Sequence, residues 1–87
     1  MHELHAFVNI FVDVSLMGEV IGALSKMDNV EEIYEVTGEF DIVTLVSASD
    51  IESLSDLLKN RIMKVNGVKS TVTSIILSPY KGAKCAT

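Results

Sequence analysis

The chain has 87 residues, of which 48% are hydrophobic and 22% charged, with five Gly, one Pro, one Cys and no Trp. This length fits a single domain, because a hydrophobic core seldom divides below about 100 residues. No run reaches the roughly 18 apolar residues of a membrane span, and residues 1–5 lack the basic charge of a signal peptide. The single cysteine, Cys85, excludes an internal disulfide framework or a cysteine-based zinc site, so we expect a reducing, cytoplasmic location.

The net charge of −5 argues against a general nucleic-acid-binding protein, and the charge is unevenly distributed. All twelve acidic residues lie in residues 1–56 beside a single Lys, whereas residues 57–87 hold the other basic residues and no acid. This asymmetry indicates either a basic binding face or a fold that interleaves the two halves. We favour the second interpretation, because the elements described next place both halves in one sheet.

Residues 5–14 alternate as a β-strand does when it is covered on both faces. Branched and small apolar side chains share one face, which comprises Ala6, Val8, Ile10, Val12 and Val14. The other face carries two aromatic side chains among polar ones, namely His5, Phe7, Asn9, Phe11 and Asp13.

A helix is predicted over residues 15–27, with Ser15 as its N-cap. Its apolar side chains recur at helical spacing, at Leu16, Val20, Ala23, Leu24 and Met27. Residues 30–37 alternate again, and three glutamates among them predict an edge strand with access to solvent. A short Gly-Glu connection then leads to the apolar run 40–48, which predicts an antiparallel hairpin whose second strand is central.

Ser49 and Glu52 have the spacing of a capping box and predict the start of a second helix. The apolar stripe of this helix comprises Ile51, Leu54, Leu58, Ile62 and Val65. The pair Asn66 and Gly67 is typical of a helix C-terminus.

Residues 68–78, rich in Thr, Ser and Ile, predict a last strand that ends before Pro79. We assign residues 1–79 to one domain and residues 80–87 to a flexible C-terminal tail.

The order β-α-β-β-α-β is that of an α+β ferredoxin-like (split βαβ) sandwich. Right-handed crossovers place the first and third strands in the centre of a four-stranded antiparallel sheet. Two helices cover only one face, so the face with Phe7, Asn9 and Phe11 would be exposed in a monomer. Exposed apolar patches usually mark interfaces, and we therefore predict a dimer that packs sheet against sheet.

Motifs for catalysis or metal binding are absent from the sequence. His2 and His5 lie close together, but no other residue supplies the spacing of a metal site, so we expect no metal. There is no Ser/His/Asp group, phosphate-binding Gly loop or dinucleotide fingerprint. Neighbouring acids such as Glu31 and Glu32 face opposite sides of a strand and cannot act together on one substrate. We predict that the protein is not an enzyme and needs no cofactor.

The segment VTGEFD at residues 36–41 has two interpretations. As a hairpin, it uses Gly38 for a positive φ and Asp41 to accept a hydrogen bond from a nearby amide. As a binding site, its turn amides would hold a carboxylate and Asp41 an ammonium, the two charges of a free amino acid. On the residues alone the hairpin is the simpler interpretation. Hydroxyls on the last strand are ordinary β-formers, yet they could bind a small polar ligand; they belong to Ser70, Thr71, Thr73 and Ser74.

The motifs YEVTGEFD at residues 34–41 and NGVKSTVT at residues 66–73 are more specific together than either is alone. With the Ala-Phe-Val opening strand, they resemble the effector-binding (RAM) domain of the Lrp/AsnC family of amino-acid-responsive transcription regulators. The resemblance extends from Ala6 to Ser78.

This resemblance implies sheet-to-sheet dimers that assemble into octamer- or decamer-like rings, with a free amino acid bound between dimers. It implies ligand-binding roles for Thr37, Gly38, Glu39, Phe40, Asp41, Thr71, Thr73 and Ser74. Asp41 would take the α-ammonium, and amides near Gly38 the carboxylate. The protein would be an amino-acid-binding and oligomerisation module of transcription regulation, whose partners are its own copies or full-length family regulators.

Regulators of this family carry a helix-turn-helix domain before the effector domain, whereas the first strand here begins within five residues of Met1. We therefore expect a stand-alone or excised module without direct DNA binding. Two alternatives stay open. An ACT-like regulatory domain would bind its ligand near the first strand–helix loop, and a small dimeric α+β-barrel enzyme would need a ligand-sized pocket within one subunit.

Overall fold

The strand order confirms the ferredoxin-like prediction. In the computed structural model, which describes residues 3–82, the strands are β1 (Leu4–Val12), β2 (Val30–Glu35), β3 (Ile42–Ala48) and β4 (Val68–Ile75). They form one antiparallel sheet in the order β2-β3-β1-β4, so β1 and β3 are central. The predictions made on His2 and Cys85 concern positions outside the described residues.

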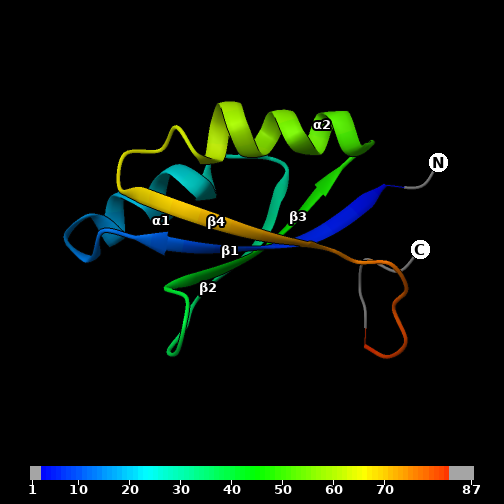
Figure 1. Ribbon diagram of the computed structural model, residues 1–87, viewed down its shortest axis with the longest axis horizontal. Helices are drawn as coiled ribbons and strands as arrows, with labels where there is room; N and C mark the ends of the chain where they lie inside the picture. The colour runs from blue at the N-terminus through cyan, green and yellow to red at the C-terminus, as the bar shows by residue number, and fades with distance from the viewer. Residues whose placement is uncertain (1–2, 83–87) are drawn as a thin grey trace.

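Both helices cover the same face of the sheet (Figure 1). A 3-10 turn, η1 (Val14–Leu16), precedes α1 (Met17–Ser25), and α2 (Ile51–Asp56) continues into the π-helical segment η2 (Leu57–Ile62). The core fills the space between sheet and helices, and it includes Ala6, Val8, Ile10, Val20, Leu24, Ile42, Val46, Leu54 and Ile62. Within residues 3–82, no helix has the length and apolar character needed to cross a membrane.

The opposite face of the sheet carries no helix (Figure 1). Exposed apolar side chains form a strip on this face. Phe7 is 43% exposed, Tyr34 54% and Val72 48%. These three residues lie on different strands but on the same face of the sheet. Asn9 shares this face with Phe7 and pairs with Val72 on β4. On its other side Asn9 pairs with Val43, which in turn pairs with Tyr34 on β2. This strip is the uncovered surface that the period-two pattern of β1 predicted.

The residues that cap the two helical segments differ from those predicted. Asp13 was predicted to be in the first strand, with Ser15 as the helix N-cap. Asp13 is instead the cap of η1, because its carboxylate accepts hydrogen bonds from the Ser15 amide (3.1 Å) and hydroxyl (2.8 Å). Likewise Asp50, not Ser49, caps α2 by accepting from the Ser53 amide at 2.7 Å. A carboxylate at a helix N-terminus gains from the helix dipole as well as from the hydrogen bond.

The hairpin strands and the last strand are shorter than predicted. The second strand was expected to reach residue 37 and the third to start at residue 40, but β2 ends at Glu35 and β3 starts at Ile42. The last strand stops at Ile75 rather than residue 78, and residues 76–82 have no regular structure, with Leu77 91% exposed. The flexible tail at residues 80–87 stays a prediction, since residues 83–87 lie outside the described part.

The second helix is not the uniform α-helix that its stripe predicted. Ile51 is 58% exposed, whereas Leu57, which the stripe omits, is only 3% exposed. The Met63 amide bonds the Leu58 carbonyl at 2.9 Å, five residues back. A π-helical turn brings residues five apart onto one face, which buries Leu57 and Ile62 together.

Candidate ligand-binding site

The connection between β2 and β3, residues 36–41, is a hairpin closed at its base. The Val36 amide donates to the Asp41 carbonyl at 3.0 Å. Gly38 has φ of +109°, a region that favours glycine, and a Cβ there would meet nothing within 4 Å. The requirement for glycine at this position is therefore conformational rather than steric.

Asp41 ties this hairpin to the central strand β1. Its amide donates to the Ile10 carbonyl at 3.1 Å, and its Oδ2 accepts from the Val12 amide at 2.9 Å in a partly buried position. Regular β1–β3 pairing ends at the pair Ile10 and Ile42. The carboxylate thus takes the place of the missing strand partner of Val12, which confirms the hairpin interpretation of Asp41.

An aromatic pair holds the same hairpin from the uncovered face. The rings of Phe11 and Phe40 lie 4.9 Å apart between centroids, tilted by 51°. Such pairs contribute about 0.5–1.5 kcal/mol beyond the area they bury. With its base fixed in this way, the hairpin presents an exposed tip of three residues, Thr37, Gly38 and Glu39.

The predicted hydroxyl residues of β4 are spread along the strand rather than gathered at the hairpin. Thr71 pairs with Ile10 and is therefore level with Asp41, on the other side of β1 and about 10 Å away in backbone spacing. Thr73 pairs with Val8, farther from the hairpin, and Ser74 pairs with Phe7 and faces the opposite side of the sheet. A single chain therefore brings together residues 37–41 but leaves the hydroxyl residues of β4 apart from them.

The first strand–helix loop, where an ACT-like domain would bind its ligand, lies at this same end of the sheet. Hydrogen bonds from Ser15, first from its hydroxyl and then from its amide, lower the pKa of Asp13 below its usual value of 3.8. The Asp13 amide in turn donates to the Gly67 carbonyl at 2.8 Å. The polar groups of this loop are thus engaged with one another.

A hollow of about 620 Å³ opens at the other end of the sheet, beside α2. None of the predicted ligand-binding residues lines it; its walls are Glu3, Asn29, Ser49, Glu52, Ser53, Asp56, Leu57 and Arg61. The hollow lies at the surface, whereas the barrel-enzyme alternative needs a pocket inside the subunit, where the core side chains are packed.

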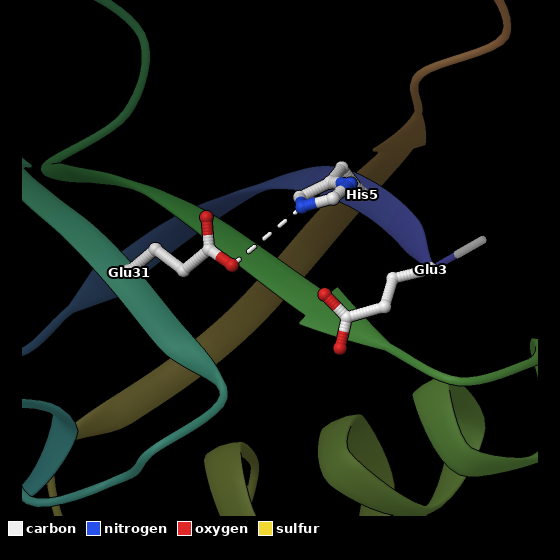
Figure 2. Close-up of side chains that lie close together, drawn as sticks. All are labelled: Glu3, His5 and Glu31. Carbon is white, nitrogen blue, oxygen red and sulfur yellow. Dashed lines mark ion pairs between the residues drawn. The ribbon is translucent and has the colours of Figure 1, made fainter. Parts of the chain in front are cut away.

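The structure also contains a cluster of possible metal ligands that the sequence did not predict. His5 lies beside two carboxylates, those of Glu3 and Glu31, as Figure 2 shows. In the sequence, the only other histidine near His5 is His2, and no local signal indicates that an acid from a different strand lies next to it.

Comparison with known proteins identifies the type of domain. The family profile described as Lrp/AsnC ligand binding domain matches residues 5–84. Among curated relatives, the HTH-type transcriptional regulator Ptr1 of Methanocaldococcus jannaschii is 29% identical over 79 residues, which cover 91% of this chain and 53% of the relative. The chain spans about half the length of the curated relatives it matches.

Solved structures agree with this assignment. TTHA0845 from Thermus thermophilus superposes with a TM-score of 0.83 at 32% identity, covering 88% of this chain and 96% of that one. The feast or famine regulatory protein Rv3291c from M. tuberculosis, complexed with L-methionine, superposes with a TM-score of 0.80 at 34% identity. There the match covers 93% of this chain and 54% of the other.

Proposed function

Because the chain belongs to the Lrp/AsnC ligand binding domain family, we propose that it is an amino-acid-binding and oligomerisation module of transcription regulation. The family is a regulatory ligand-binding domain, and the protein is not an enzyme. The observation that carries the proposal is the hairpin of residues 36–41, which combines a fixed carboxylate with an exposed, glycine-containing tip. The proposal includes a cytoplasmic location, as for other regulators of transcription.

Asp41 is the residue we assign to the α-ammonium of the ligand. Of its two carboxylate oxygens, Oδ2 accepts a hydrogen bond from the Val12 amide, whereas Oδ1 accepts none from residues 3–82 and can therefore accept from an ammonium group. The amides around Gly38 would bind the carboxylate, and Thr37, Glu39 and Phe40 would line the pocket. A relative with 34% identity was solved with L-methionine, which supports a free amino acid as the class of ligand.

The spread of the other site residues supports a pocket made by more than one copy. Thr71, Thr73 and Ser74 do not converge with the hairpin in a single chain. We therefore place the ligand between neighbouring dimers, where the hairpin of one copy meets residues of another. An effector acts only through its different affinity for two states, so binding here would shift the assembly equilibrium.

The assembly we propose begins with a sheet-to-sheet dimer. Phe7, Asn9 and Phe11 would lie in its interface, together with the apolar strip that includes Tyr34 and Val72. Dimers would then join into octamer- or decamer-like rings, alone or with full-length family regulators. The module would act on transcription through these partners.

A panel of the twenty amino acids, each at millimolar concentration, tests the sensing function. We expect at least one of them to raise the melting temperature and to change the mass measured by light scattering. If no amino acid alters either quantity, the proposed sensing function is wrong. The oligomerisation function is tested separately by the mass of the protein without ligand, which should exceed that of one chain.

Asp41→Asn tests the proposed site with little damage to the fold. The amide oxygen can still accept from the Val12 amide, so we expect a loss of only about 1 kcal/mol in stability. The ammonium loses its charged partner, so the ligand-induced shift should disappear. Asp13→Asn is the matched control, because it removes a carboxylate from the strand–helix loop at the same end of the sheet. Loss of binding in Asp13→Asn with retention in Asp41→Asn would favour the ACT-like alternative.

Phe7→Glu tests the dimer. A charge in the centre of the exposed strip should yield monomers in light scattering, since an unpaired carboxylate is costly to bury. Leu77→Glu is the control, because Leu77 is 91% exposed and lies beyond the end of β4. Equal masses for Phe7→Glu and the unaltered chain would refute the sheet-to-sheet interface.

A further inference from the structure

We propose that Glu3, His5 and Glu31 bind one divalent transition-metal ion of the zinc type, at the end of the sheet opposite the β2–β3 hairpin. One ligand atom from each of the three residues lies within 4.8 Å of the other two. Figure 2 shows the two carboxylates and the imidazole directed toward a common space. This proposal does not depend on the amino-acid-binding function.

A β-bulge brings Glu31 to the imidazole. The register of β2 against β3 shifts between Val30 and Glu32, so Glu31 is the extra residue of the bulge. Bulges redirect side chains and are frequent next to functional sites. His5 on β1 pairs with Ser47 on β3, whose side chain is small. Glu31 on β2 extends across β3 at this position, and the Glu31 Oε2 atom lies 3.5 Å from His5 Nε2.

The donor set favours zinc over calcium or magnesium. Calcium and magnesium prefer oxygen ligands alone, whereas an imidazole with carboxylates suits Zn²⁺ and, more weakly, Mn²⁺. With metal–ligand distances of about 2.0–2.2 Å, tetrahedral ligands lie about 3.4 Å apart. The distance of 3.5 Å between His5 Nε2 and Glu31 Oε2 is close to this value, and a Glu3 carboxylate oxygen lies within 4.8 Å of both residues' ligand atoms. Three protein ligands then leave a fourth position for water.

The charges around the cluster also favour a cation. Within residues 3–82, the contact between His5 and Glu31 is the only ion pair within 4 Å, so neither glutamate is neutralised by Lys or Arg. Arg61 lines the hollow that Glu3 also borders, but it forms no such pair with Glu3. Two carboxylates that share one space repel each other, and a divalent cation removes this repulsion. The His5 side chain is only 13% exposed, so one of the three donors is already held in place.

Zinc titration by calorimetry tests the site in the full chain carrying His2→Asn and Cys85→Ser. These two changes remove zinc-ligand types that lie outside the described residues. We expect one zinc ion per chain, and a loss of affinity of more than about tenfold in Glu3→Gln and in Glu31→Gln. Glu35→Gln is the control, since Glu35 is an exposed glutamate on the same strand outside the cluster, and it should bind zinc like the parent.

A second measurement uses Mn²⁺ as a paramagnetic probe and needs no substitution at the site. In NMR spectra, MnCl₂ should broaden signals of Glu3, His5 and Glu31 before those of Gly38, at the far end of the sheet. The proposal is overturned if zinc produces no binding heat up to about 1 mM. It is equally overturned if both glutamate variants bind zinc as tightly as Glu35→Gln, or if Mn²⁺ broadens other regions first.

Discussion

Gly67 is the position at which one added methyl group should cost the most stability. Its φ is +105°, and a Cβ there would lie 2.8 Å from Leu16 Cβ and 2.9 Å from Val20 Cγ2. The Gly67 carbonyl also accepts the Asp13 amide at 2.8 Å. The residue therefore lies where the start of β4 meets η1 and α1, with no room for a side chain.

The cost of Gly67→Ala has two parts. Holding an L-residue in the left-handed region costs about 1–2 kcal/mol. Forcing a methyl group into packed neighbours costs about 1–3 kcal/mol more, because helix side chains or backbone must move. The total of about 2–5 kcal/mol is a large share of the stability of a small domain, and it corresponds to a fall in melting temperature of roughly 10 °C or more.

Two other glycines separate these contributions. Gly38 has φ of +109° but open space around it, so Gly38→Ala should show the conformational cost alone, about 1–2 kcal/mol. Gly22 lies in the interior of α1, also with nothing within 4 Å, and Gly22→Ala should stabilise the protein by up to about 1 kcal/mol.

Urea denaturation followed by circular dichroism measures all three variants. Protein concentration must be equal throughout, because association of copies contributes to the apparent stability. If Gly67→Ala loses no more stability than Gly38→Ala, the packing argument is refuted. A destabilised Gly22→Ala would contradict the helix argument instead.

Other substitutions test the core and the caps. Leu24→Ala removes a fully buried side chain and should lose about 2–5 kcal/mol in urea denaturation. Thr44→Val removes a buried hydroxyl that donates to the Val8 carbonyl at 3.1 Å, and should lose about 1 kcal/mol in the same assay. Hydrogen bonds from nearby serines lower the pKa values of Asp13 and Asp50 below 3.8, so their contribution is present above pH 3.8 and is lost as the pH falls through the lowered values. In thermal melts against pH, the difference in stability between the unaltered chain and Asp50→Asn should shrink below that pH; a constant difference would contradict this assignment.

The features that local sequence patterns predicted are those that repeat along one element. Ala6 and Val8 face the helices and Phe7 faces away because a strand has a period of two, whatever surrounds it. The positive φ of Gly38 was also predictable, and so was the hydrogen bond that the Asp41 carboxylate accepts from a backbone amide, because both are typical of a short hairpin.

Features that depend on distant contacts were not predictable from these patterns. The Asp13 amide donates to the carbonyl of Gly67, a residue far away along the sequence, and no local pattern shows this contact. The π-helical turn buries Leu57 in the core, and a pattern with a period of 3.6 residues does not indicate it. The approach of Glu31 to His5 depends on a bulge, which changes which face a residue occupies and has no signature in the alternation itself.

The pairing of the first strand with the last has a consequence for how the chain folds. β4 pairs with β1 from Ala6–Ile75 to Val12–Val68, so one side of this central strand has no partner until β4 has been synthesised. Closing so long a loop is slow, and an unpaired strand edge is a template for other chains. For a protein proposed to work as an assembly of copies, β4 must dock within its own chain faster than strands exchange between nascent chains. A polypeptide that stops before Val68 should therefore aggregate rather than form dimers.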